Sequence, residues 1–440
     1  MGNLLSIVLA VGLLTVMIAW GKVQPLIAFV IAALVAALLL GMPAAKIPGA
    51  IEKGIGDLLG SLVVVICLGA VFGKLVADSG AARCIAGTLI EKLGPARLPV
   101  ALTVTGFVVG LPLYYNVGFV LMVPLIFSLV YGAGRPAVAL AIPLLAGLSI
   151  AHGFLPPHPS PTALVAAVHA DMGTTLVYGL IVAIPTLIIA GPLFAMRLHG
   201  IRGEPAAMFR TPPSDAVQPD LAPPGAFNSF ATALLPVLLL AVLTLTTLAR
   251  PELAQSLAFL SNPLVVMLVS YGVAVVTLGL ARGQKLSAVM GSAQEALREI
   301  APILLIIAGA GALKQVMVES GVSAELGAQL SHLPVPPLLL GWAVATLIRI
   351  CLGSATVAGV TAAGVVGPLV QTSGCDPNLM VLAVGAGSLM CSHVNDSGFW
   401  MFKEYFGLSL KDTFRSWSLM ETLVGTFGLL FVMLLSLLVQ

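Results

Sequence analysis

Residues 392–398 read Ser392-His393-Val394-Asn395-Asp396-Ser397-Gly398 and lie between two hydrophobic segments of the chain. They stand out because 59% of the 440 residues are hydrophobic and only 9% are charged. An imidazole and a carboxylate at membrane depth are costly unless they face protein or water, so ionisable groups placed there usually mark a functional site. The alternative is a short aqueous loop that joins two membrane spans.

The composition is that of a membrane protein. Soluble domains carry about 25% charged residues, so the 9% found here excludes an ordinary soluble enzyme, and the net charge of +2 gives no indication of a nucleic-acid partner. Residues 1–20 contain no Lys or Arg, so we do not expect a cleaved signal peptide. Apolar runs of about 20 residues, the length that crosses a hydrocarbon core, occur at 3–20, 23–40, 60–76, 230–248, 264–280 and 419–439. The sequence therefore predicts an all-α polytopic protein of the lipid bilayer, with about a dozen spanning or half-spanning helices.

The sequence contains no motif for a cofactor or a metal. Its five cysteines are scattered and show neither a disulfide framework nor the spacing of a zinc site. Neither a helical HExxH motif nor a GxxxxGK[ST] phosphate loop occurs. A zinc hydrolase can be considered for His152 and His158, but the prolines around them prevent the one-face helical geometry that such a site needs. We expect no cofactor, and energy from an ion gradient rather than from ATP.

Two apolar segments of the first half are interrupted by proline and glycine. Residues 110–118 read Gly110-Leu111-Pro112-Leu113-Tyr114-Tyr115-Asn116-Val117-Gly118, and residues 156–161 contain four prolines. Proline disrupts a helix interior, and irregular backbone at membrane depth is tolerated only where it is buried in protein or lines a cavity. We therefore expect a broken helix at each place.

The second half repeats landmarks of the first half at a constant offset of 241 positions. The offset carries 110–118 onto 351–359, and it carries the proline-rich stretch onto the one that begins at Ser392. The matches are Ser79-Gly80 with Ser320-Gly321, Gly118 with Gly359, Pro136 with Pro377, His152 with His393, and Asp171 with Asp412. The chain is therefore predicted to contain two repeats with broken helices and re-entrant hairpins, and we expect residues 392–398 to form half of a hairpin tip.

The positive charges predict that the two repeats have opposite orientations. If the charge-free N-terminus lies outside, then Lys403, Lys411 and Arg415 fall inside, whereas the matching loop around Asp171 has no Lys or Arg and falls outside. An excess of Lys and Arg marks cytoplasmic loops. Equivalent loops on opposite faces mean inverted topology, the architecture of many secondary transporters. This orientation places both termini in the periplasm.

The breaks of the two halves are predicted to meet at one site. Half-helix N-termini offer positive potential to an anion, and freed carbonyl and hydroxyl groups can bind cations or sugar hydroxyls. Imidazole titrates near neutral pH, and a carboxylate in a low-dielectric cavity gains proton affinity, so His393 and Asp396 are the candidates for proton coupling. The candidate substrate-binding residues are Tyr115, Asn116, His152, Ser160, Thr162, Arg349, Ser354, Thr356, Ser392 and Asn395.

These candidates also have structural interpretations. Ser354 and Thr356 could be small residues of ordinary helix packing. Arg349 could bind a substrate carboxylate through two hydrogen bonds, or it could extend its charge to the membrane interface. The histidines could be structural hydrogen-bonding groups.

Several motifs resemble those of the gluconate permease (GntP) family of bacterial sugar-acid:proton symporters, which is grouped with a wider ion-transporter superfamily. The resemblance covers essentially the whole chain and implies uptake of gluconate or a related sugar acid across the bacterial inner membrane, coupled to proton entry. The superfamily relation implies a homodimer in which a transport domain moves against a fixed scaffold like an elevator. The motifs include Thr105-Gly106-Phe107, His152-Gly153-Phe154-Leu155-Pro156-Pro157-His158-Pro159, Gly353-Ser354-Ala355-Thr356, Ser392-His393-Val394-Asn395-Asp396 and Lys403-Glu404-Tyr405-Phe406.

One position departs from the family pattern. Asn116 stands where members of the family often have an acidic residue, and an amide cannot exchange a proton. Either Asp396 or His393 then couples transport to protons, or the stoichiometry or substrate differs. A sodium-coupled organic-anion symporter and a passive sugar-acid facilitator remain alternatives.

The composition and the repeats together suggest a division of the chain. Residues 200–225 alone have the composition of a soluble loop, with six prolines. The predicted parts are N-terminal scaffold helices (1–57), a first inverted repeat (58–198), a cytoplasmic proline-rich linker (199–227), scaffold helices with an interfacial segment (228–298), and a second inverted repeat (299–440).

Overall fold

The computed structural model describes residues 2–94, 97–133, 136–201, 203, 224–322, 334–394 and 396–439. This part is almost entirely helical and contains no strand, which confirms the predicted all-α class. The helices of the first half are α1 (Gly2–Ala19), α2 (Pro25–Leu39), η1 (Ala44–Lys46), α3 (Ile47–Asp78), α4 (Ala81–Leu93), α5 (Leu98–Gly110), α6 (Tyr115–Ala133), α7 (Ala137–Phe154), α8 (Pro159–Val168), α9 (Met172–Ile188) and η3 (Ile189–Leu193).

The second half has a similar order of helices. They are α10 (Ala226–Ala249), η5 (Pro251–Leu253), α11 (Ala254–Ser261), α12 (Pro263–Ala274), η6 (Val275–Gly279), η7 (Leu280–Arg282), α13 (Leu286–Glu319), α15 (Pro337–Leu352), α16 (Ala355–Ser373), α17 (Pro377–Leu389), α18 (Ser397–Tyr405), α19 (Leu410–Thr413), η8 (Phe414–Ser418) and α20 (Leu419–Val439).

Many of these helices can cross a membrane. Seven stretches of the described chain are long and apolar enough, or eight if α3, which bends by 44° between Gly60 and Leu62, counts as one span. Five shorter apolar helices of 10–17 residues, in α1, α2, α5, α15 and α17, accompany them. α5, α15 and α17, with 13–16 residues at about 1.5 Å each, are too short to cross a hydrocarbon core alone. They fit the predicted half-spanning elements, whereas α1 and α2 coincide with the runs at 3–20 and 23–40 that were predicted to span.

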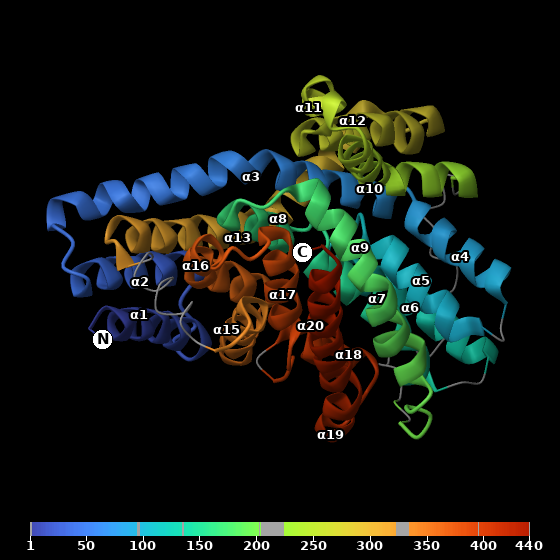
Figure 1. Cartoon of the computed structure of the whole chain (residues 1–440). Helices are drawn as coiled ribbons and strands as arrows, with labels where there is room; N and C mark the ends of the chain where they lie inside the picture. Colours follow the sequence, from blue (N-terminus) through green and yellow to red (C-terminus); the bar gives the residue numbers. More distant parts are fainter. Residues whose placement is uncertain are drawn as a thin grey trace.

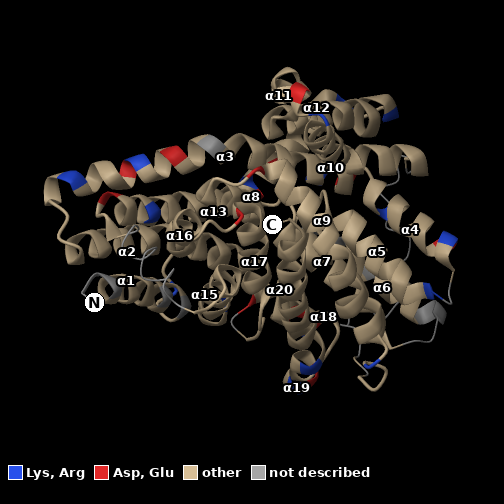
Figure 2. Cartoon of the chain, in the orientation of Figure 1, with Lys and Arg blue, Asp and Glu red and all other residues tan. Residues whose placement is uncertain are grey.

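Charged residues avoid the middle of the molecule. Figure 2 shows them mainly along α3 and at the outer parts of α4 and α19, while the central helices are almost free of charge. Helices α7, α17 and α20 pack against one another there (Figure 1). In α7 every residue except His152 is buried. The same holds for α17, in which every residue except Pro377 is buried. A helix that is apolar on all sides belongs in a protein core, so α7 and α17 form the centre of the fold, while α20 covers them on one side.

The two longest helices, α3 and α13, lie side by side and antiparallel (Figure 1). At one end a Cβ atom on Gly54 would lie 2.3 Å from the carbonyl oxygen of Gly311. Toward the other end Lys74 pairs with Glu295 at 3.2 Å. Glycine at the contact allows the backbones to approach closely, as is common between helices in membranes.

Helix bounds in the two halves match at the offset of 241 positions. Residues 98–110 of α5 map onto 339–351, within α15, and 137–154 of α7 map onto a range that begins one position after the start of α17. The neighbours match as well: α5 packs on α7 as α15 packs on α17, and α2 packs on α13 as α12 packs on α3. Two structural repeats require such correspondences, while their opposite orientation and the elevator division remain predictions.

The predicted breaks take two different forms. Helices α15 and α16 pack against each other across a tight turn at Gly353 (φ 73°) and Ser354, which makes them a helical hairpin. By contrast, the chain leaves α17 at Leu389 and enters α18 at Ser397, and α18 does not pack along α17 within the residues described. The expectation that residues 392–398 form a hairpin tip is therefore wrong. They lie in a break between consecutive helices, and the tip of the hairpin is at Gly353 and Ser354.

The predicted division of the chain cuts through two helices. The borders after residue 57 and after residue 298 fall inside α3 and α13. Moving bodies are usually joined at loops or helix ends. The division into scaffold and transport parts remains a prediction, and we expect the borders between them at helix ends rather than at residues 57 and 298.

Candidate functional site

A cavity of about 260 Å³ lies where the breaks of the two halves meet. The starts of α6, α16 and α18 and the ends of α7 and α15 form its wall, together with parts of α13 and α20. Six of the predicted site residues line it: Tyr115 and His152 from the first half, and Arg349, Ser354, Thr356 and Asp396 from the second.

Arg349 is buried beside the cavity rather than extended to the membrane interface. It lies in the last turn of α15 and is only 3% exposed. Its Nη2 donates to Oδ2 of Asp396 at 2.5 Å, whereas its Nε and Nη1 have no hydrogen-bond partner among the described residues. A guanidinium carries its five N–H donors in a planar fork that matches a carboxylate. Arg349 can therefore pair with Asp396 and still bind an anion.

Asp396 is held by several donors at once. Its Oδ1 accepts from the backbone N–H of Gly398 at 3.0 Å, which caps α18. Its Oδ2 accepts from Arg349 and from the hydroxyl of Ser392, and that hydroxyl in turn accepts from Nε1 of Trp417 at 2.7 Å. The carboxylate thus ties the break before α18 to α15 and to η8.

The N-terminal end of α16 faces the same cavity. Ser354 caps this 19-residue helix, and its hydroxyl oxygen accepts from the N–H of Val357 at 3.3 Å. Ala355 and Thr356 of the first turn line the cavity. Backbone N–H groups at a helix N-terminus carry partial positive charge and favour an anion. The helix end and Arg349 therefore attract the same kind of ligand.

Tyr115 and His152 supply polar groups from the first half of the chain. The Tyr115 ring lies 6.2 Å from the His152 ring and 5.9 Å from the Trp417 ring, measured between centroids. The Tyr115 hydroxyl and Nδ1 of His152 are buried and make no hydrogen bond with any residue that the structure describes. Buried polar groups are nearly always hydrogen-bonded, so these two atoms suit the hydroxyl groups of a ligand.

Four other predicted residues do not line the cavity. Ser160 and Thr162 are buried in α8, where a Cβ atom on Gly359 of α16 would lie 2.7 Å from the Ser160 hydroxyl oxygen. Ser392 belongs to the Asp396 network, and Nε2 of His393 lies 2.9 Å from the carbonyl oxygen of Ile350. Asn395 and the side chain of Asn116 lie outside the described residues.

His158 has a structural contact. Its Nε2 lies 2.8 Å from the carbonyl oxygen of Gly110 at the end of α5. No group of three His, Cys, Asp or Glu side chains that could hold a metal ion occurs in the described part of the chain.

Five polar residues of the cavity were not among the predicted site residues: Tyr114, Ser149, Ser397, Trp417 and Glu421. Glu421 is 3% exposed, and its Oε2 accepts from the hydroxyl of Ser149 at 2.9 Å. It is the third residue of the last apolar run of the chain, and an acidic residue inside such a run is by default a functional candidate. That signal was present in the sequence at residues 419–439.

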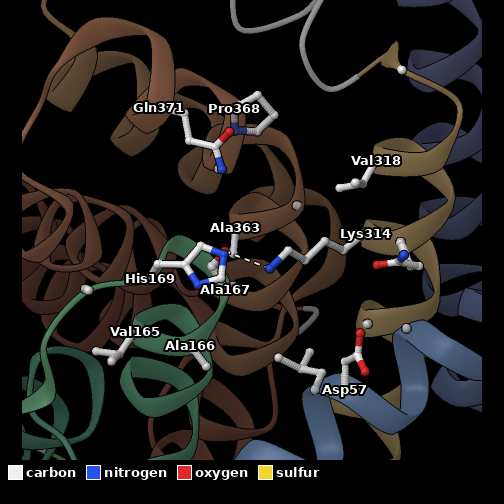
Figure 3. A pocket seen from close by; sticks show the side chains of 18 residues that line it. Asp57, Val165, Ala166, Ala167, His169, Lys314, Val318, Ala363, Pro368 and Gln371 are labelled. Atoms are coloured by element: carbon white, nitrogen blue, oxygen red, sulfur yellow. Dashed lines mark hydrogen bonds between the residues drawn. The ribbon is translucent and has the colours of Figure 1, made fainter.

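A second cavity, of about 830 Å³, lies between α3, α8, α13 and α16 (Figure 3). Lys314 of α13 extends into it, and its Nζ donates to the carbonyl oxygen of Ala167 at 2.9 Å. This carbonyl is near the C-terminal end of α8, where a cation is favoured. Asp57, His169 and Gln371 also line this space. Helix α16 borders the small cavity with its first turn and the large one with its second half.

A sequence model of the GntP family permease matches residues 2–438. The chain belongs to the GntP permease family. This GntP member is therefore a multi-pass membrane protein, in agreement with its many apolar helices.

Curated relatives match this GntP member over nearly their full lengths. The high-affinity gluconate transporter of Escherichia coli K12 is 42% identical, over 98% of this chain and 99% of the relative. The Gnt-II system L-idonate transporter of the same organism is also 42% identical, over 98% of each chain. The gluconate permease of Bacillus subtilis 168 is 41% identical, over 98% of this chain and 99% of the relative. All three are named as transporters or permeases.

Two solved transporter structures share the fold of this chain. The Alcanivorax borkumensis YdaH transporter superposes with a TM-score of 0.68 at 18% identity, covering 95% of this chain and 98% of the other. Neisseria gonorrhoeae MtrF gives a TM-score of 0.61 at 13% identity, with 93% of each chain covered. The GntP chain shares its overall architecture with these proteins.

Proposed function

We propose that this GntP family member imports gluconate, or a closely related sugar acid, across the bacterial inner membrane. The observation that carries the proposal is Arg349, a buried guanidinium with unpaired Nε and Nη1 atoms in the wall of a cavity between broken helices. Relatives with 41–42% identity are named for gluconate and for L-idonate. Both molecules have one carboxylate and a chain of hydroxyl groups. The guanidinium of Arg349 can bind the carboxylate, and the polar side chains of the cavity can bind the hydroxyl groups.

In the proposed complex, the substrate carboxylate binds Arg349 and the N-terminal end of α16. The hydroxyl groups bind Thr356, the Tyr115 hydroxyl and Nδ1 of His152. A charge-assisted pair fixes one end of the ligand, and neutral hydrogen bonds along the wall then discriminate between stereoisomers. Asn116 and Asn395 remain predicted contacts, while Ser160, Thr162 and Ser392 act through the packing of the helices around the cavity.

The proposed cycle exposes this site to one side of the membrane at a time. The body that contains both breaks moves against the scaffold in a homodimer, as the resemblance to the wider superfamily implies, and both termini lie in the periplasm. The two cavities that border different parts of α16 support such a cycle, because alternating access needs water-filled space on each side of a bound substrate.

Proton entry drives uptake in this proposal. His393 and Asp396 were predicted to carry the proton, and those roles remain predictions. His393 does not line the cavity, and Asp396 lines it while paired with Arg349.

Uptake into liposomes tests the function. Purified protein should accumulate labelled gluconate against its gradient when the outside is made acid, and a protonophore should abolish the accumulation. Uptake that ignores pH but requires a sodium gradient would assign sodium coupling, and uptake that never exceeds equilibrium would identify a facilitator. Failure of gluconate, L-idonate and related sugar acids to bind or to move would overturn the proposal.

A further inference from the structure

Glu421 is an acidic side chain buried in a membrane-spanning helix. It lies in the first turn of α20, is 3% exposed, and belongs to an apolar stretch that covers residues 410–439. It lines the same cavity as Arg349. A buried carboxylate is costly unless it is paired or takes up a proton, so its partners determine what it can do.

The partners of Glu421 are few. Its one hydrogen bond within the described chain is from the hydroxyl of Ser149, at 2.9 Å. No Lys, Arg or His side chain described here lies within 4.0 Å of its carboxylate oxygens. Asp396, by contrast, accepts from Arg349, from Ser392 and from a backbone N–H. Of the two acids in the cavity, Glu421 is the one without a cation.

The surroundings of Glu421 contain few other titratable groups. Helices α7, α9, α15 and α17 and the turns η3 and η8 pack against α20. Of the titratable side chains on these elements, only Arg349 and His152 line the cavity with Glu421, while Tyr114, Tyr115 and Asp396 line it from other elements. The remaining ones are Tyr178 on α9, Cys351 on α15 and Arg415 on η8, and α17 and η3 carry none.

The balance of charge in the cavity determines when an anion can enter. Arg349 and Asp396 neutralise each other as an ion pair. With His152 neutral, an ionised Glu421 leaves the wall with one negative charge, and a sugar-acid carboxylate would add a second. Like charges in a space of low dielectric repel strongly. A proton on Glu421 removes this repulsion.

We propose that Glu421 carries the proton that is transported together with the sugar acid. The inference rests on the proposed function and assigns coupling to a residue other than His393 and Asp396. Binding of the anion favours the protonated carboxyl group, and the protonated group favours the anion by the same factor. The proton comes from water on the side where the cavity opens and returns to water on the other side. An O–H bond of a hydronium ion breaks as the O–H bond of the carboxyl group forms, and the reverse exchange releases the proton to water on the other side.

Proton uptake on substrate binding tests the assignment. Gluconate is added to purified protein in weakly buffered detergent solution that contains a pH-indicator dye. The wild type should take up about one proton for each gluconate bound where the free carboxylate is ionised. Glu421→Gln, which resembles the protonated acid, should still bind gluconate, with no proton uptake and no pH dependence. Glu404→Gln serves as the matched control, because Glu404 is exposed and pairs with Lys403 away from the cavity.

The possible outcomes separate the two proposals. If Glu421→Gln binds gluconate and still takes up a proton, the assignment is overturned. If proton uptake is lost only in Asp396→Asn, Asp396 is the proton carrier. A wild type that binds no sugar acid contradicts the proposed function itself.

A second variant keeps the test decisive if Glu421→Gln does not fold. Ser149 donates to the carboxylate and so favours its ionised form. Ser149→Ala should therefore raise the pH midpoint of proton uptake by on the order of one pH unit. A midpoint unchanged from that of the wild type would contradict the role of Glu421.

Discussion

Arg349 faces both Asp396 and the cavity, so two substitutions can separate its role in stability from its role in binding. Lysine keeps the positive charge that Asp396 requires but lacks the planar fork. We expect Arg349→Lys to fold and to bind gluconate about 10- to 100-fold more weakly, the equivalent of about 1.5–3 kcal/mol for a charge-assisted hydrogen bond. Isothermal titration calorimetry measures this difference. Affinity equal to that of the wild type would place the carboxylate elsewhere.

Arg349→Gln tests the ion pair. It leaves the Asp396 carboxylate without its cation, and breaking a buried pair costs about 3–5 kcal/mol of folding free energy. We expect a lower melting temperature and no measurable gluconate binding. The double variant Arg349→Gln with Asp396→Asn should recover part of the melting temperature without recovering binding. A double variant as unstable as the single one would show that the pair is not the source of the loss.

Single residues also show what the sequence could predict about the site. Arg349 and Asp396 were predictable because charges are rare in an apolar chain, and the same signal was available at Glu421. Ser160 and Thr162 were placed in the site because they follow a break, yet they lie on buried faces of α8. In a helix surrounded by protein, periodicity does not show which face a hydroxyl occupies. Only the packing of α8 against α16 decides it.

At the scale of helices, the contact between α3 and α13 depends on two glycines. A Cβ atom on Gly311 would lie 2.3 Å from the carbonyl oxygen of Gly54, and backbone at this distance cannot yield without moving a helix. We expect Gly311→Ala to cost about 1–3 kcal/mol of stability, as overpacking does. Gly291→Ala on the same helix is the control, because nothing lies within 4 Å of its Cβ position. The melting temperature in detergent should fall for Gly311→Ala, and it should stay the same or rise for Gly291→Ala.

The positions of the helix breaks could be predicted from the sequence, but the direction that the chain takes after each break could not. Proline at 156–161 and glycine at 353 end helices for local reasons, since one lacks an N–H donor and the other allows a positive φ. Whether the chain then turns back or continues depends on which helix it packs against. After Ser354 the chain returns along α15, whereas after Asp396 it does not return along α17. That difference is tertiary, and no local pattern at 392–398 contains it.

At the scale of the molecule, the antiparallel packing of α3 and α13 supports the prediction that the repeats are inverted. The two helices occupy matching positions in the halves and run in opposite directions, with Gly54 near Gly311 and Lys74 near Glu295. The offset of 241 positions was readable from the sequence because prolines and glycines mark helix ends. The orientation depended on counting Lys and Arg in loops, and it can be measured directly.

Ala170 and Lys411 are a matched pair for that measurement, because the offset of 241 positions relates them. Ala170 lies just before α9, and Lys411 lies in the short helix α19. Each is changed to cysteine in a chain whose five native cysteines are replaced by alanine. With inverted repeats, a membrane-impermeant thiol reagent should label Ala170→Cys in intact cells and Lys411→Cys only after the membrane is opened. Labelling of both from the same side would mean parallel repeats. In that case the two pairs of breaks could not be related by an axis in the membrane plane, and the proposed alternation between two cavities along α16 would lose its structural basis.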